Sequence, residues 1–355
     1  MFSKSCLATG IAIGALVLTI GLDGNNASAQ TTLTMATGDA VGSLRNQVGN
    51  WVRDQLAEQG GGLRVQHIEG PVLGNAAQIT DQVIDGSVDI FGTDAAWLTP
   101  YSDLLKTTSF AFVFRDEEHL SNVFDSDLMA SVEEAMADEF GIRILAVGVL
   151  PARTFFSLDP LASDSDLDDL KIRSPQLNVW IESYQSLGAN PTPVNWNEVF
   201  LALQTGLVEA GHGLPADVIA NQWHLAAPHI TALEDMFAVH AWFMNEDRWQ
   251  SLSPEEQEEL TSVMDASIDW LAERSDELDH DAVVTMLQDG GGTYTSHSQA
   301  NVDRIAAAIG EDRVVLFPDA AYQALRQGAL DRARELEGTA DWWGGGLVDQ
   351  IQAIE

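Results

Sequence analysis

Residues 253–260 read SPEEQEEL, and they predict where a long helix begins. Ser253 is a preferred N-cap residue, Pro254 suits the first helical position, and Glu256 stands where the glutamate of a capping box stands. The apolar residues that continue the helical spacing are Leu260, Met264, Ile268, Leu271 and Met286. No proline or glycine follows Pro254 before Gly290. A helix of roughly 30 residues is too long for one small lobe, so we expect it to brace two.

The length of the chain also favours two lobes. It has 355 residues, more than one hydrophobic core comfortably holds, since domains usually contain about 100–200 residues. Hydrophobic residues make up 45% of the chain, which is ample for folding.

Strand and helix patterns alternate in the first third of the chain. The predicted strands are Leu33–Met35, Leu63–Ile68 and Val88–Gly92, and the predicted helices between them are Leu44–Leu56 and Gln78–Ile84. This order indicates an α/β lobe. Further along, Ile142–Leu150 is an almost continuous apolar run, typical of a buried strand.

The patterns that follow predict a second set of strands and helices. Arg153–Ser157 and Leu170–Arg173 are predicted strands, and Val179–Leu187 is a predicted helix. We also expect a helix over Asn197–Glu209. Its inward-facing residues would be Val199, Phe200, Leu203 and Leu207.

The N-terminus has the layout of a secretory signal peptide. Lys4 precedes an apolar run from Leu7 to Leu22, and the small residues Ala27-Ser28-Ala29 follow it. We expect cleavage near Ala29. A membrane anchor is the alternative, but the run is shorter than the ~20 apolar residues that a span needs. Because the one cysteine, Cys6, lies in this segment, disulfides and thiolate sites are not expected in the exported chain.

The chain is strongly acidic. Lys and Arg number 17 against 54 Asp and Glu, for a formal net charge of -37. The acids are spread along the sequence, which favours an acidic folded surface over an acidic tail. Such a surface excludes nucleic acid as a partner and suits salty surroundings, where self-repulsion is screened.

Motifs of common enzyme and metal sites are absent. The sequence has no phosphate-binding glycine loop, no HExxH and no Gly-x-Ser-x-Gly. His224 and His229 lack the spacing of a helical metal pair. We therefore expect no metal, no cofactor and no catalysis.

The segment LKIRSP, residues 170–175, places two cations just before a proline in a chain that is very poor in lysine. A guanidinium offers parallel N–H donors that match the two oxygens of a carboxylate, which a lysine cannot do. Arg173 is therefore the candidate anion ligand, and Lys171 is expected to be exposed to solvent. An ordinary surface role for Arg173 is the alternative.

From Gln30 onward the chain resembles the extracytoplasmic solute receptors of tripartite ATP-independent periplasmic (TRAP) transporters, of the DctP type. The segments that carry the resemblance are GPVLGNAAQITDQVIDGSVDI, LDDLKIRSPQLNVW, LGANPTPVNWNEVFLALQTGLVEAG and NEDRWQSLSPEEQEEL. The third of these is highly specific in order and spacing.

The resemblance implies a periplasmic binding protein-like fold: two α/β lobes around a ligand cleft, with a long helix spanning both. The expected lobes are residues 30–151 with 239–279, and residues 152–238 with 280–320. Residues 1–29 would be the signal peptide and 321–355 a C-terminal helical segment. The implied partners are a small organic anion, bound by hinged closure of a monomer, and the membrane subunits of a TRAP permease.

The resemblance also implies roles for single residues. Arg173 matches the arginine that forms a two-pronged salt bridge with the ligand carboxylate, and Arg153 resembles a second arginine near the ligand. An ion pair of Arg153 with Asp159 is the alternative. Trp196 falls at an aromatic position beside the ligand, although core packing would also explain it. Asp94 stands where some relatives carry an acidic ligand contact, and a plain surface acid is equally compatible.

The sequence departs from the family pattern at residues 209–213, EAGHG. Gly213 replaces a ligand-contacting asparagine and would leave room in the pocket, and His212 stands where an acid is common. We expect His212 to donate to an anionic group. Trp97 and Trp223 are candidates either for the enlarged pocket or for the core.

The resemblance, together with these residues, implies a periplasmic receptor for a small organic anion, most simply a carboxylate. Two alternatives remain open at this point. One is a receptor for a zwitterionic osmolyte such as ectoine, and the other is a periplasmic enzyme.

Overall fold

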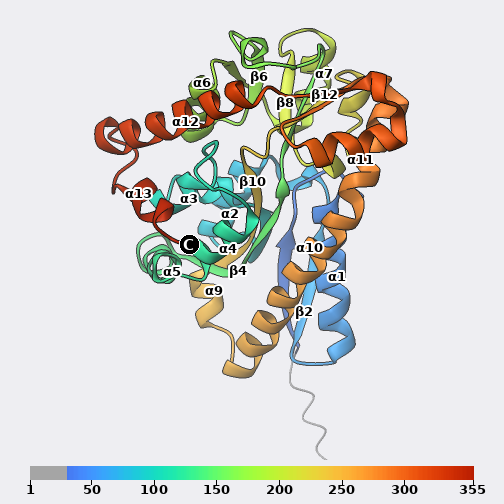
Figure 1. The fold of residues 1–355 in the computed structure, drawn as a ribbon. Helices are drawn as coiled ribbons and strands as arrows, with labels where there is room; N and C mark the ends of the chain where they lie inside the picture. The colour runs from blue at the N-terminus through green and yellow to red at the C-terminus, as the bar shows by residue number, and fades with distance from the viewer. Residues whose placement is uncertain (1–29) are drawn as a thin grey trace, which may run out of the picture.

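Two lobes, each built on its own β-sheet, form the protein (Figure 1). The computed structural model describes residues 30–355, apart from the side chains at positions 276, 277 and 279. The predicted signal peptide and Cys6 therefore lie outside the described residues. The expected α/β architecture with two lobes is confirmed.

Lobe I is a five-stranded sheet in the order β2-β1-β3-β10-β4. Its strands are β1 (Thr31–Ala36), β2 (Leu63–Ile68), β3 (Ile90–Asp94), β4 (Ile142–Ala152) and β10 (Phe237–Asn245). Its helices are α1 (Leu44–Gln59), α2 (Ala76–Ile84), α3 (Asp103–Thr107), α4 (Glu117–Phe124), α5 (Asp127–Phe140) and α9 (Glu246–Gln250). β1 pairs in parallel with β2 and β3, whereas β10 runs antiparallel to β3 and β4.

Lobe II is a seven-stranded sheet in the order β12-β11-β9-β5-β8-β6-β7. Its strands are β5 (Thr154–Ser157), β6 (Lys171–Ser174), β7 (Asn190–Pro193), β8 (Ala210–Gly213), β9 (His229–Ala232), β11 (Tyr294–Ser296) and β12 (Val314–Leu316). Its helices are α6 (Asn178–Ser186), α7 (Val199–Gln204), α8 (Pro215–Ala220) and α11 (Gln299–Ile309). Short 3-10 turns also occur, including one at Trp196–Glu198 and one at Trp223–Leu225.

The chain crosses between the lobes at neighbouring points. The first crossing is Arg153, between β4 of lobe I and β5 of lobe II, and the second lies between β9 and β10. The two crossings are hydrogen-bonded, since the backbone N–H of Arg153 donates to the carbonyl of Met236 at 2.8 Å. Arg153 is thus held at the junction of the lobes.

Helix α10 (Pro254–Gly290) is 37 residues long and packs against both lobes. It contacts β4 and α1 of lobe I, then α8, β9 and α11 of lobe II, and Figure 1 shows it running along the side of both. The predicted capping box at Ser253 and Glu256 is present. Gly291 ends the helix in the left-handed conformation, with φ 73°. The expectation of a bracing helix is confirmed.

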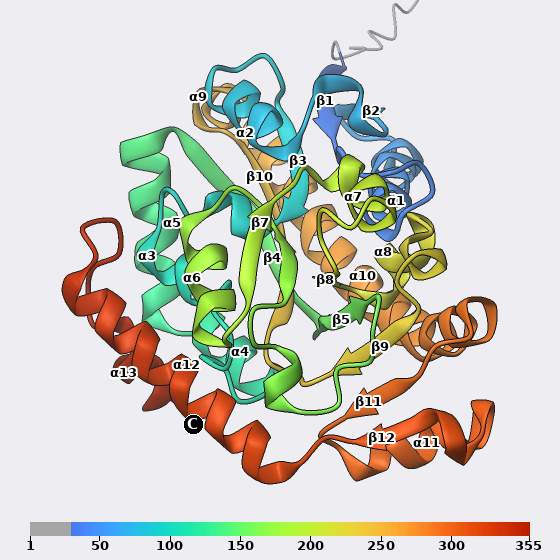
Figure 2. The same ribbon diagram turned by 90° about the horizontal axis from the view of Figure 1, so that it is seen from above.

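The C-terminal segment forms a second connection between the lobes. α12 (Asp319–Thr339) packs on α6 of lobe II, and α13 (Leu347–Gln352) packs on α3 of lobe I (Figure 2). The exact domain boundaries given above stay a prediction. None of the helices within residues 30–355 has the length and apolar character needed to cross a bilayer.

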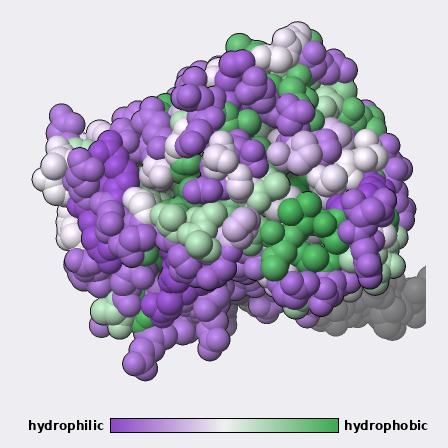
Figure 3. Space-filling view, turned by 45° about the horizontal axis from the view of Figure 1, so that its top comes forward, coloured by the Kyte–Doolittle hydropathy of each residue, from purple (hydrophilic) through white to green (hydrophobic). Residues whose placement is uncertain are grey.

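Figure 3 shows a face covered mostly by hydrophilic residues, with hydrophobic ones gathered in few places. The exposed large hydrophobic residues are Val41, Val72, Phe140, Leu201, Leu207, Leu225 and Leu316.

The helix predicted over Asn197–Glu209 is shorter than expected. α7 ends at Gln204, Gly206 takes a left-handed backbone with φ 70°, and Leu207 is 54% exposed instead of facing inward. A glycine in this conformation stops a helix, and the chain then turns into β8. The apolar spacing alone did not reveal this stop.

Gly92 provides a test of how lobe I packs on α10. It pairs with Trp242 across β3 and β10, and the buried indole of Trp242 donates to Ser267 of α10 at 2.8 Å. A Cβ at Gly92 would overlap the indole ring. Gly92→Ala should lower the free energy of unfolding by about 1–3 kcal/mol, because the core is overpacked. Urea titration measures this loss.

Gly328→Ala is the matched control, since Gly328 lies inside α12 with open space around its Cα. It should raise stability by roughly 0.5–1 kcal/mol, because alanine favours a helix more than glycine does. Equal effects of the two substitutions would contradict the packing account.

Candidate functional site

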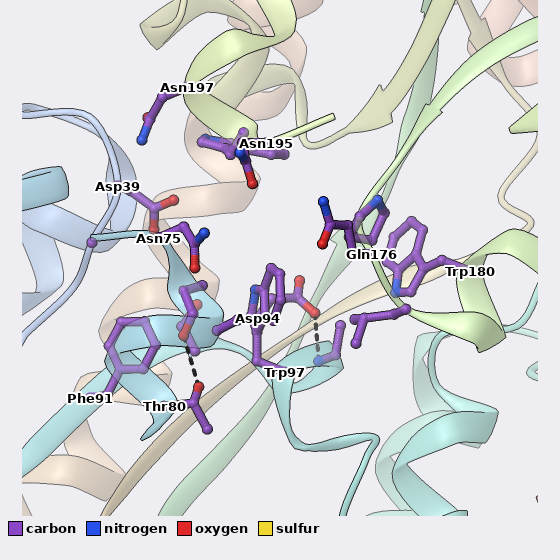
Figure 4. A pocket seen from close by; sticks show the side chains of 18 of the residues that line it. Asp39, Asn75, Thr80, Phe91, Asp94, Trp97, Gln176, Trp180, Asn195 and Asn197 are labelled. Atoms are coloured by element: carbon purple, nitrogen blue, oxygen red, sulfur yellow. Dashed lines mark hydrogen bonds between the residues drawn. The ribbon is translucent and has the colours of Figure 1, made fainter. Parts of the chain in front are cut away.

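A cavity of about 300 Å³ lies between the two lobes (Figure 4). Lobe I contributes lining residues from the loop after β1, from α2 and from the segment after β3. Lobe II contributes β6 with the turn after it, the Val194–Asn197 segment and His212. The site is therefore built from residues of both lobes.

Arg173 on β6 lines this cavity and is buried, with 7% of its surface exposed. Its Nε donates to the carbonyl of Val194 at 2.9 Å, and its Cζ lies 5.3 Å from the ring centroid of Trp196. Within residues 30–355 as described, no carboxylate forms an ion pair with it. Burial lowers the pKa of Arg173 to about 10, while Tyr184 opposes and Arg153 adds to this shift. The guanidinium therefore stays charged at neutral pH without a partner.

Arg153 and Arg45 also line the cavity, but their charges are compensated. Arg153 forms a short ion pair with Asp94, and its Cζ lies 5.1 Å from the ring centroid of Trp180. Arg45 of α1 contacts Asp217 at 3.2 Å and Asp94 at 3.4 Å. Burial alone would lower the pKa of Arg45, but Asp217 and the other nearby carboxylates raise it.

Asp94 is not a plain surface acid, because its carboxylate is mostly buried and pairs with two arginines. Its Oδ2 accepts from both arginines, and its Oδ1 accepts from the backbone N–H of Ala96 at 2.9 Å. The partner of Arg153 is Asp94, so the alternative ion pair with Asp159 is wrong. A direct ligand contact by Asp94 stays a prediction, and the observed contacts orient two arginines. Lys171 is exposed and pairs with Glu209 at 2.9 Å, as expected.

Aromatic rings form much of the wall. Trp196, Trp97 and Trp180 line the cavity. Trp223 does not, because it is buried behind Trp196 with ring centroids 4.5 Å apart. Trp196 therefore combines cavity wall and core packing, and Trp223 belongs to the core.

His212 and Gly213 have different positions. His212 lines the cavity and stacks on Phe155 with ring centroids 4.2 Å apart, while its Nε2 lies 3.4 Å from Asp235. Gly213 is not part of the lining: a Cβ there would lie 3.8 Å from Phe156 and from Trp196. The predicted ligand contacts of these two residues stay predictions, and Gly213 lies behind the wall that Trp196 forms.

Sequence reasoning missed several lining residues. Figure 4 shows Asp39 and Asn75 on one side of the cavity and Gln176 and Trp180 on the other. Asn195 and Asn197 also face it. Arg45 was within reach of sequence reasoning, because it precedes Val48 and Val52 on the buried face of the predicted helix. Asp39 had no such signal, since acids are common throughout the chain.

The sequence profile of the bacterial extracellular solute-binding proteins, family 7 (DctP), matches residues 45–312. The chain belongs to this family. Among its relatives is the sialic acid-binding periplasmic protein SiaP of Vibrio cholerae, 30% identical over 237 residues, which are 64% of this chain and 71% of SiaP. The ectoine-binding periplasmic protein TeaA of Halomonas elongata is 26% identical over 220 residues, covering 61% of this chain and 58% of TeaA.

Solved structures of TRAP receptors share the fold of this family 7 member. A receptor from a Bradyrhizobium species in complex with galacturonate is 26% identical, with a TM-score of 0.72, covering 91% of this chain and 99% of that one. A Roseobacter denitrificans receptor with bound β-D-glucuronate has a TM-score of 0.77 at 20% identity. The match covers 92% of this chain and 100% of that receptor. Among residues 30–355, no cluster of three or more His, Cys, Asp or Glu could hold a metal ion.

The Arg45–Asp217 pair joins lobe I to lobe II, and both side chains are buried. Asp217→Ala should lower the free energy of unfolding by about 1–3 kcal/mol, because a buried charged hydrogen bond is lost while Asp94 still faces Arg45. Thermal and urea unfolding report the change. Asp54→Ala removes an acid from the exposed Arg53–Asp54 pair and should cost about 1 kcal/mol or less. A larger loss for Asp54→Ala would refute this ranking.

Proposed function

We propose that this receptor binds a small organic acid in the interlobe cavity, with its carboxylate on Arg173, and delivers it to a TRAP-type membrane permease. The observation that carries the proposal is the unpaired charge of Arg173, buried at the cavity wall. A buried charge is costly unless it is paired. A ligand carboxylate supplies the missing partner, and two parallel N–H···O bonds fit the planar guanidinium.

The relatives support an acid as the ligand. The galacturonate and glucuronate bound to the two similar receptors each carry one carboxylate and several hydroxyls. The lining of this cavity offers side-chain amides at Asn75, Gln176 and Asn195, which can donate to and accept from hydroxyl groups. Trp196 and Trp97 exclude water and provide flat apolar faces for a sugar-sized ring.

The delivery step follows from the family. The proposed receptor acts in the periplasm as a monomer after removal of residues 1–29, and the permease subunits read its closed form. No cofactor or metal enters this scheme. Closure of two lobes around a ligand is a general way to couple binding to a shape that a partner recognises.

Two other functions are less well supported. A zwitterionic osmolyte such as ectoine would also satisfy Arg173, and TeaA shows that such receptors exist among the relatives. The acids bound in the solved TRAP receptors favour a carboxylate with hydroxyl groups. A periplasmic enzyme would need a reacting group beside the ligand, and the family consists of binding proteins.

Substitution of Arg173 tests the carboxylate site. Arg173→Ala should weaken binding of the acid by about 2–5 kcal/mol, because the buried ion pair is lost. Arg173→Lys should recover only part of this affinity, since a lysine keeps the charge but not the paired donors. A thermal-shift screen of sugar acids finds the ligand, and titration calorimetry measures the affinities. Unchanged affinity of Arg173→Ala would refute the assigned role.

A binding protein should return its ligand unchanged. After prolonged incubation with the protein, the acid found in the screen should be recovered intact in NMR spectra and at its starting concentration. Turnover that disappears in the Arg173→Ala variant would instead establish an enzyme.

A further inference from the structure

We propose that Asp39 selects the far end of the ligand: it accepts a hydrogen bond from an O–H or N–H group of the bound acid and rejects a second carboxylate. This inference rests on the proposed function, because it assumes that Arg173 holds the first carboxylate. It adds a specificity rule, namely that the receptor takes hydroxy or amino monocarboxylates and discriminates against dicarboxylates.

Asp39 lies in the loop between β1 and α1 and lines the cavity, and 16% of its side chain is exposed. Figure 4 shows it across the cavity from Gln176 and Trp180. Its Oδ2 is buried and has no hydrogen-bond partner within the part of the chain that the structure describes. The nearest cationic nitrogen is Nε of Arg45, at 3.9 Å, which is beyond hydrogen-bond distance.

The charges around Arg45 explain why Asp39 lacks a partner. Arg45 is closer to Asp217, at 3.2 Å, and to Asp94, at 3.4 Å. Arg153, the other guanidinium nearby, is engaged by Asp94. Three carboxylates thus share two guanidinium groups, and Asp39 is the one held least closely.

The titration of Asp39 agrees with this geometry. Burial raises the pKa of Asp39 to about 7, Arg45 opposes the shift, and the carboxylates of Asp217 and Asp94 add to it. Arg173 is not among the charges that shift this pKa. Its own pKa responds to burial, Tyr184 and Arg153. Asp39 and Arg173 also come from different lobes, Asp39 from the loop after β1 and Arg173 from β6.

The buried wall of the cavity consequently offers an unpaired cation, Arg173, and an underpaired carboxylate, Asp39. A ligand with a single carboxylate and a hydrogen-bond donor elsewhere satisfies both. A dicarboxylate would satisfy Arg173 but bring its second charge toward Asp39, where Asp94 and Asp217 add to the repulsion and Arg45 is already shared. In a partly buried site the repulsion between like charges is substantial.

Matched pairs of acids test this rule. The probes are gluconate with glucarate and 4-hydroxybutyrate with succinate, since the second member of each pair carries a carboxylate in place of a hydroxymethyl group. Titration calorimetry at pH 8, above the raised pKa of Asp39, compares the wild-type receptor with Asp39→Asn. Asp54→Asn is the control, because it removes the same charge from the exposed face of α1.

For the pair whose monocarboxylate binds, the wild-type receptor should prefer that acid by about tenfold or more. Asp39→Asn should reduce this preference to roughly threefold or less. The change should come chiefly from tighter binding of the dicarboxylate, because the amide carries no charge that repels it. Asp54→Asn should keep the wild-type ratio. Equal wild-type binding of both acids, or an unchanged ratio in Asp39→Asn, would overturn the role of Asp39.

The proposed function fails in a different way. If none of the monocarboxylates binds, or if binding does not depend on Arg173, the carboxylate site itself is wrong and the rule built on it falls too. Arg173-dependent binding with no effect of Asp39→Asn would leave the proposed function in place and refute only the inference about Asp39.

Discussion

The burial of the Arg173 guanidinium without a carboxylate is the constraint on which the site depends. Folding removes this cation from water and offers it a backbone carbonyl and the face of Trp196. Neither compensates a full charge. The wall of the cavity therefore holds a buried positive charge that no carboxylate of the described residues balances. In the function proposed above, an anion that enters between the lobes balances this charge, and ligand binding favours lobe closure for this reason.

The neighbouring arginines, Arg153 and Arg45, have the carboxylate partners that Arg173 lacks. Arg153 is oriented by Asp94, and Arg45 joins α1 to α8 through Asp217. These pairs hold the frame of the cavity, because Arg153 stands at a crossing between the lobes and Arg45 spans them. The acid-rich composition makes such pairs easy to form, and an unpaired arginine in this chain is therefore all the more informative.

Much of the architecture could be predicted from local signals. The capping box at Ser253 and the unbroken spacing after it predicted α10, and the apolar run Ile142–Leu150 predicted β4. These predictions succeeded because capping and periodicity act over a few residues. The helix expected over Asn197–Glu209 was too long, since the apolar spacing was followed past Gly206 to Leu207 although a glycine is a common helix stop. The left-handed turn at Gly206 and the start of β8 ended it.

The sequence by itself determined the family, the α/β class, the bracing helix and Arg173 as the principal candidate, because each rests on a motif or on local spacing. Only the tertiary structure decided that Arg153 pairs with Asp94 and not Asp159, that Gly213 lies behind Trp196, and that Asp39 is left underpaired. Such contacts join residues far apart in the chain, as Arg45 and Asp217 do. Their energies depend on distance and burial, which the order of residues does not specify.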